Sequence, residues 1–132
     1  MISTYLWIAV GGALGSMARF WLAAFVANIL GPQFPWGTIL INIVGSFIIG
    51  FFATFAGPGG RFVASFNARA FVMVGICGGF TTFSAFSLQT LDLARDNHWA
   101  QAGGNVALSV VACLFAVWAG HMLAAALIPA QE

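Results

Sequence analysis

The residues best suited to handling an ion lie together in the second half of the chain. Phe83 and Phe86 are three positions apart, which places both rings on one side of a helix, and Ser84 and Ser87 add hydroxyl donors nearby. The edge of a phenyl ring is electropositive, so a ring presented edge-on can favour an anion while excluding bulk water. A single phenylalanine in such a segment normally contacts core or lipid. Ring edges combined with hydroxyl donors indicate a site for a small, hard anion.

The stretch just before these rings combines three glycines, Gly75, Gly78 and Gly79, with the pair Thr81 and Thr82. It lies midway through a segment that is otherwise apolar enough to cross a membrane. Because glycine weakens a helix, we expect a break near the membrane midplane that frees backbone carbonyls. Such carbonyls are costly in hydrocarbon unless they meet a donor or a cation, so the break predicts a site.

Two further stripes of polar side chains recur every four residues along the expected second and fourth membrane spans. They are Thr38, Asn42 and Ser46 on the second span, and Asn105, Ser109 and Cys113 on the fourth. This spacing puts each stripe along one side of its helix. An amide or hydroxyl in hydrocarbon costs free energy unless it is bonded. Each stripe therefore either joins helices or lines a route for something polar, and the spacing favours neither alternative.

Composition identifies the elements that must position these residues as membrane helices. Of the 132 residues, 61% are hydrophobic and only 5% are charged, whereas a soluble domain carries roughly a quarter charged residues. The net charge of +1 and the scattered arginines argue against a nucleic-acid partner. Cys77 and Cys113 have no second Cys or His at ligand spacing, so we expect neither a disulfide framework nor a zinc site.

Apolar runs bounded by turn signals predict four transmembrane helices in a single domain that covers residues 1–132. The expected spans are about residues 4–30, 36–56, 70–91 and 103–128. The first is too long for a signal peptide, so we expect it to be retained. Residues 61–69 form either a short interfacial helix or a plain loop. The fold class is thus an all-α integral membrane protein with a broken third helix.

Charge within the spans narrows the function further. No Asp, Glu or Lys falls in the predicted membrane core, and Arg19 is the only charged candidate there. Proton-coupled transport normally needs a titratable carboxylate or His at membrane depth, and catalysis needs a nucleophile with its base. Both functions are therefore disfavoured.

Arginines are nearly balanced across the membrane. Arg61 and Arg69 lie on one side, whereas Arg95 lies on the other and Arg19 lies towards that side. An asymmetry this small leaves the orientation open, which would allow insertion in both orientations and an antiparallel homodimer. The alternative is a single orientation set by Arg61 and Arg69.

With these features the chain closely resembles the Fluc fluoride channel family, also called CrcB-like proteins. The resemblance covers essentially the whole chain: four short spans, the early Arg19, the Gly37–Asn42 start of the second span, and the Gly75–Phe86 motif with its Gly-Gly-Phe-Thr-Thr-Phe-Ser core. It implies a dual-topology, antiparallel homodimer in the inner (plasma) membrane. This dimer would export fluoride passively from the cytoplasm through two pathways, with the lipid bilayer and a second copy of the chain as its only implied partners.

The resemblance also implies roles for individual residues. A structural sodium ion would be held by the main-chain carbonyls of Gly78 and Thr81 of both subunits. The pore rings fall on Phe83 and Phe86, the pore amide on Asn42, and the vestibule arginine on Arg19. The pore-side hydroxyls fall on Ser84 and Ser109. The expected fluoride pathway, which also includes polar positions described above, comprises Asn42, Phe83, Phe86, Ser84, Thr82, Ser109, Gln89, Asn105, Cys113 and Arg19.

Two positions depart from the family pattern. Gln89 stands where family members often carry Glu, and Cys113 stands where they carry a hydroxyl residue. Gln still donates and accepts hydrogen bonds, whereas a thiol is a weak donor, so Cys113 is expected to slow the ion.

Two alternatives belong to other classes of protein. Small multidrug-resistance exporters also have four short spans, but they resemble one another in an essential Glu of the first span, where this chain offers only Arg19. A structural subunit of a larger membrane complex is the other alternative.

Overall fold

The computed structural model describes residues 1–129, and its regular structure over these residues is entirely helical. The elements are α1 (Ile2–Leu30), α2 (Trp36–Phe55), α3 (Phe66–Arg69), η1 (Ala70–Cys77), α4 (Gly78–Phe80), α5 (Phe83–Arg95) and α6 (Trp99–Ala126). Four helical stretches are long and apolar enough to cross a membrane: Ile2–Leu30, Trp36–Phe55, Phe66–Arg95 and Trp99–Ala126. This confirms the predicted all-α, four-span fold, with span ends that differ from the prediction by at most four residues.

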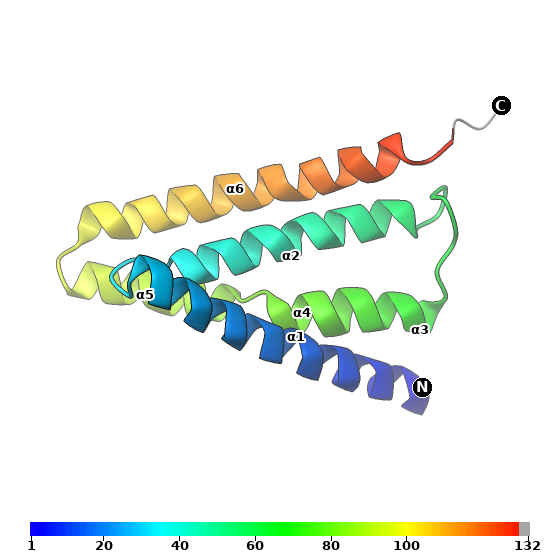
Figure 1. Cartoon of the computed structure of the whole chain (residues 1–132), viewed down its shortest axis with the longest axis horizontal. Coiled ribbons are helices and arrows are strands. Elements are labelled where there is room, and N and C mark those ends of the chain that lie inside the picture. The colour runs from blue at the N-terminus through cyan, green and yellow to red at the C-terminus, as the bar shows by residue number, and fades with distance from the viewer. Residues whose placement is uncertain (130–132) are drawn as a thin grey trace.

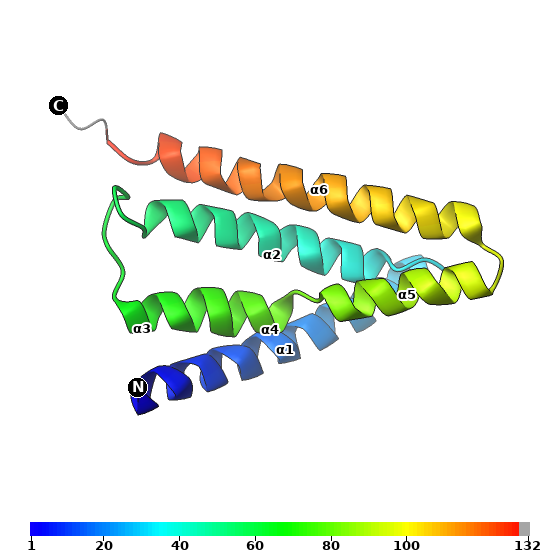
Figure 2. The same ribbon diagram turned by 180° about the vertical axis from the view of Figure 1, so that it is seen from behind.

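The spans form one layered bundle. In both views α2 lies between α6 and the third span, and α1 runs across the third span (Figures 1 and 2). Accordingly, α2 packs mainly against α6, and α1 packs mainly against η1 and α4. The N-terminus, the α2–α3 connection and the end of α6 lie at one end of the bundle (Figure 1). The connections after α1 and α5 lie at the other end.

The connection between α2 and α3 is a loop that ends in a helical turn. Residues 61–65 are not helical, whereas Phe66–Arg69 form α3, which continues directly into η1. Ser65 caps this helix, because its hydroxyl oxygen accepts a hydrogen bond from Ala68 N at 3.2 Å. Each of the two alternatives for residues 61–69 therefore holds for part of the segment.

The third span is broken as predicted, but the glycines are not where it breaks. The chain stays helical through Gly75, Gly78 and Gly79, first as the π-helix η1 and then as α4. It becomes extended at Thr81 (φ −79°, ψ 157°) and Thr82 (φ −153°, ψ 113°) before α5 begins. The glycines therefore lie just before the break, with Gly75 in the π-helix, and do not themselves form it.

Close packing against α1 explains two of these glycines instead. A Cβ atom on Gly75 would lie 2.9 Å from Gly11 Cα, and one on Gly79 would lie 2.6 Å from Gly12 O. Small residues let membrane helices approach closely, and the packing gained there offsets the poor helix propensity of glycine. The glycines thus fix the first half of the third span on α1 and bring the break to a defined depth.

Candidate functional site

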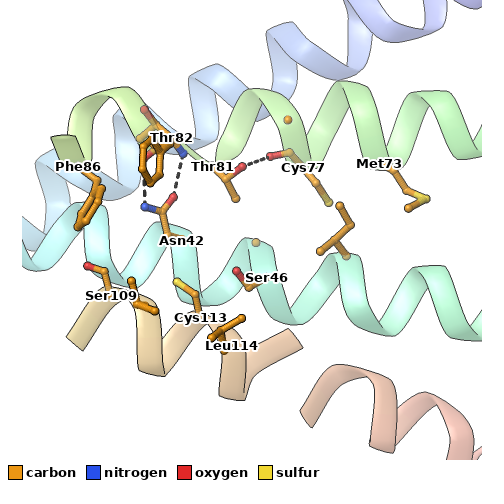
Figure 3. Close-up of a pocket in the computed structure, with 15 residues that line it drawn as sticks. Asn42, Ser46, Met73, Cys77, Thr81, Thr82, Phe86, Ser109, Cys113 and Leu114 are labelled. Carbon is orange, nitrogen blue, oxygen red and sulfur yellow. Dashed lines mark hydrogen bonds between the residues drawn. The ribbon is translucent and has the colours of Figure 1, made fainter. Parts of the chain in front are cut away.

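A groove of about 450 Å³ lies between α2, the broken third span and α6. It brings together eight of the residues predicted from the sequence: Asn42, Gly78, Thr81, Thr82, Phe83, Phe86, Ser109 and Cys113. Figure 3 shows several of these side chains converging from the three helices. Gly45, whose added Cβ would overlap the Thr81 methyl group, lets the break lie directly against α2.

Asn42 holds the break through both ends of its amide. Thr82 N donates to Asn42 Oδ1 at 2.8 Å, and Asn42 Nδ2 donates to Thr82 O at 3.1 Å (Figure 3). The side chain therefore replaces the helical partners that Thr82 loses at the break. One of the two Nδ2 hydrogens is not used in this pair, so Asn42 keeps a donor at the groove.

The break frees the carbonyls of Gly78 and Thr81, two residues that line the groove. Thr82 N, which would bond Gly78 O in a continuous helix, is taken by Asn42, and Ala85 N, which would bond Thr81 O, is taken by Thr82 Oγ1 at 3.1 Å. Among residues 1–129, no backbone N–H donates to Gly78 O or Thr81 O across the break. Neutral carbonyl oxygens of this kind suit a monovalent cation, whereas a divalent cation normally recruits carboxylates. The part of the chain that the structure describes holds no cluster of three His, Cys, Asp or Glu residues.

Thr82 also starts the second half of the span. Its hydroxyl caps α5 at Ala85 N and lies 3.2 Å from Ser84 Oγ. The N-terminus of the 13-residue helix α5 consequently lies midway along the third span. A helix N-terminus carries partial positive charge, which favours an anion at this depth.

The two rings meet at the groove but differ in their surroundings. Their centroids are 5.3 Å apart with an interplanar angle of 48°. Phe86 is buried, with 8% of its surface exposed, whereas Phe83 is 78% exposed. Both rings line the groove, as the three-residue spacing predicts. The exposed surface of Phe83 is available for contact with another molecule.

The polar stripe on α6 forms a hydrogen-bonded chain that leads back to α5. Ser109 Oγ donates to Asn105 Oδ1 at 3.3 Å, and Asn105 Nδ2 donates to Thr90 Oγ1 at 2.8 Å. Thr90 Oγ1 in turn donates to Phe86 O at 2.8 Å. Ser109 lines the groove, but Asn105 does not: it is almost fully buried between α5 and α6. At Asn105 the stripe joins helices, and at Ser109 it faces the groove.

Besides Asn105, three predicted residues lie outside the groove. Ser84 is exposed, Arg19 is half-buried on α1, and Gln89 lines a separate cavity of about 350 Å³ that also contacts Thr38. Gln89 Oε1 is buried, and no group among residues 1–129 donates to it.

Sequence reasoning missed several contributors, among them Gly45, Thr90 and Met73. Thr90 is the partner of Asn105 in the hydrogen-bonded chain, and Met73 lines the groove. Thr90 donates to the carbonyl of Phe86, four residues earlier in the same helix, as threonines in helices commonly do. The sequence therefore gives no sign that it also accepts from Asn105 on α6. Ser46, which also lines the groove, belongs to the predicted α2 stripe but not to the predicted pathway.

Comparison with known proteins places this architecture in a family. The family model described as "CrcB-like protein, Camphor Resistance (CrcB)" matches residues 6–121. The chain is similar to proteins named "Fluoride-specific ion channel FluC" from three bacteria. It is 62% identical over 123 residues to that of Methylocella silvestris, covering 93% of this chain and 94% of the relative.

Two further relatives carry the same name. The protein of Opitutus terrae is 60% identical, with 96% of each chain covered. That of Rhodospirillum rubrum is 56% identical, with 90% of this chain and 92% of the relative covered. These relatives are ion channels and not enzymes, and four apolar spans make this chain a multi-pass protein of the plasma membrane. The chain belongs to the CrcB-like family of membrane ion channels.

Proposed function

We propose that this protein is a fluoride-selective channel that lets fluoride leave the cytoplasm passively. The observation that carries the proposal is the groove in which the Phe83–Phe86 ring pair meets the Asn42 amide and the Ser109 hydroxyl. The relatives named as fluoride-specific channels, up to 62% identical, support it. No acidic side chain lies in the groove, so an anion meets donors and ring edges without a competing negative charge.

Selectivity for fluoride over chloride depends on how well the hydrogen bonds that the pore offers replace the water that the ion loses. Fluoride is small and strongly hydrated, so a pore that removes its water must return comparable hydrogen bonds at each step without trapping it. Asn42 and Ser109 supply donors, and the rings of Phe83 and Phe86 narrow the path to groups with electropositive edges. Chloride is larger and gains less from short, hard donors.

The working unit is an antiparallel homodimer with two pathways. In one chain the groove is open, and Phe83 is 78% exposed although it belongs to the site, which supports a second copy as its cover. The break at Thr81–Thr82 lies at the middle of the third span, Phe66–Arg95. Two copies in opposite orientations therefore bring their breaks to the same depth, whereas an off-centre break would separate them.

A structural sodium ion at the twofold axis completes the dimer. The carbonyls of Gly78 and Thr81 fit such an ion, because their helical donors have been diverted to Asn42 and Thr82. When bound, the cation would supply positive charge that satisfies these carbonyls from both subunits. Asn42 and the Thr82 hydroxyl bind the N–H groups that would otherwise donate to these two carbonyl oxygens, and so leave the oxygens free.

The test of conduction is an efflux assay with purified protein in liposomes, run with fluoride and with chloride under the same gradient. We expect rapid fluoride efflux and no measurable chloride efflux, without any need for a proton gradient. Comparable rates for the two anions, or flux that required protons, would contradict the proposal. Loss of activity in the purified isolated protein would favour a structural subunit instead.

Orientation and sodium dependence are tested separately. Reporters attached after Leu127 are expected on both sides of the membrane in cells, because the arginines are nearly balanced. Exchange of sodium for a large organic cation, under conditions that let the site equilibrate, is expected to abolish function. A uniform orientation contradicts the antiparallel dimer, and full activity without sodium contradicts the cation site.

A further inference from the structure

Positive charge collects at one end of the bundle. Arg61 and Arg69 both belong to the connection between α2 and the third span, at the end that also carries the N-terminus (Figure 1). Within residues 1–129 the only acidic side chains are Asp92 and Asp96, which flank Arg95 at the opposite end. Among residues 1–129, the first end thus carries basic side chains and no acidic one, whereas the opposite end carries two aspartates beside Arg95.

The connection that carries these arginines is held in one conformation. Arg61 N donates to Phe55 O at 3.0 Å, and the Arg61 guanidinium donates from Nη1 to Leu127 O at 3.3 Å. Ala64 N donates to Ala56 O, just after α2, at 3.1 Å. The rings of Phe62 and Phe55 meet edge-on, with their centroids 5.9 Å apart. The segment is therefore a preformed surface, and most of the Arg61 donors are still available.

Large apolar side chains project from the same segment. Phe66 is 77% exposed, Val63 is 70% exposed and Phe62 is 52% exposed. In water this exposure would leave apolar area uncovered in a segment whose backbone is already folded, at a cost of about 25 cal/mol per Å². Apolar and aromatic side chains interleaved with arginine are typical of a segment that lies in the membrane interface.

A pocket of about 390 Å³, lined by both polar and apolar side chains, adjoins this surface between α1 and α3. Thr4 Oγ1 donates to Asn67 Oδ1 at 2.7 Å, which leaves both N–H groups of the Asn67 amide as donors. Ser65 also lines the pocket, and Trp7 closes it with its ring edge-on to Phe71 at 5.6 Å. Neutral donors beside an interfacial tryptophan are suited to the glycerol and phosphate region of a lipid.

From these features we propose that the Arg61–Arg69 segment and the adjoining pocket form a binding surface for an anionic phospholipid. The arginines attract the negative headgroup, the donors of Ser65 and Asn67 bind its oxygens, and Val63 and Phe66 contact the acyl region. This occupant has both an anionic and an apolar part, which the surface requires and a free anion lacks. In an antiparallel dimer each leaflet would contain one such surface.

The experiment compares phosphatidylglycerol with phosphatidylcholine of identical acyl chains, added to the purified full-length protein in detergent and counted by native mass spectrometry. The wild type is expected to bind phosphatidylglycerol more tightly. Each neutralised arginine is expected to weaken that binding about fivefold, so Arg61→Gln with Arg69→Gln weakens it about 25-fold and leaves phosphatidylcholine binding unchanged. The same positions changed to Lys keep the preference, and Arg95→Gln is the matched control with no effect. Val63→Ser with Phe66→Ser is expected to weaken binding of both lipids.

Three results would overturn the proposal. They are equal affinity of the wild type for the two lipids, an equal loss caused by Arg95→Gln, and displacement of phosphatidylglycerol by millimolar inorganic phosphate, which would make this a free-anion site. If the double Gln variant does not fold, the wild type itself is measured at rising salt. The preference for phosphatidylglycerol is expected to fall with salt, and a preference independent of salt contradicts the electrostatic surface.

Discussion

Replacement of Asn42 by alanine is expected to destabilise the protein through the break. The change removes the 2.8 Å bond from Thr82 N and the 3.1 Å bond to Thr82 O. Thr82 is buried, and an unpaired buried polar group costs about 1–3 kcal/mol, so loss of both partners is expected to cost about 2–6 kcal/mol. If Thr82 N returns to Gly78 O and lengthens the helix, only Thr82 O is left unpaired and the cost falls to about 1–3 kcal/mol. The Gly78 carbonyl would then no longer be free.

Aspartate at the same position separates the structural role of Asn42 from its role towards the ion. In Asn42→Asp the carboxylate still accepts from Thr82 N, but nothing donates to Thr82 O, so the lost hydrogen bond costs about 1–3 kcal/mol, and desolvation of the charge at membrane depth adds about 2.5–3.5 kcal/mol. The negative charge, however, stands where an anion must pass. Both variants are therefore expected to be less stable than the wild type, whereas fluoride flux falls in the order wild type, Ala, Asp.

Thermal unfolding of the purified protein in detergent measures the loss of stability, and fluoride efflux from liposomes measures the order of flux. Asn28, which is exposed on α1, provides a matched control, because Asn28→Ala and Asn28→Asp make the same changes away from the groove. An Asn42→Ala variant that unfolds at the wild-type temperature would refute the reasoning about the break. Wild-type flux through Asn42→Asp would show that no anion passes this side chain.

Three further predictions concern the walls of the groove. Phe83→Ile and Phe86→Ile are each expected to reduce fluoride efflux sharply while the protein stays folded, because isoleucine keeps most of the apolar volume but has no ring edge; wild-type efflux would remove that ring from the pathway. Gly45→Ala is expected to lower the unfolding temperature and the flux, since the new methyl overlaps the threonine methyl at the break, whereas Gly104→Ala, which has open space, leaves both unchanged. Cys113→Ser is expected to raise the efflux rate severalfold, because a hydroxyl is a stronger donor than a thiol; an equal or slower rate contradicts this.

The sequence predicts the spans well because hydrocarbon allows few alternatives. Long apolar runs must form helices that satisfy their own backbone, so hydropathy and turn signals locate all four spans. The polar positions Asn42 and Ser109 are predictable for a related reason, since polar side chains are unusual in such a helix, and the ring pair is predictable because it accompanies hydroxyl donors. Their spacing along a helix then places them at the groove.

Partnerships between helices are not predictable from spacing. Gly75 and Gly79 have a low intrinsic helix propensity, yet contact with α1 keeps them helical, and the break moves to Thr81–Thr82. The sequence suggests Asn105 for the pathway, but its partner Thr90 lies on another helix and draws it between α5 and α6. In both cases the local sequence is compatible with more than one arrangement, and contacts between helices determine which one forms.

The π-helix η1 bears on how this chain tolerates changes in length. A π turn holds about one residue more than an α turn, so Ala70–Cys77 absorbs an additional residue without rotating the helix beyond it. A shorter version of this stretch could close as an ordinary α-helix and still direct Thr81 and Thr82 at Asn42. Insertions or deletions of one residue during evolution are therefore expected to survive between Arg69 and Gly78. Between Gly78 and Phe86 the same change would turn the rings by about 100° away from the groove.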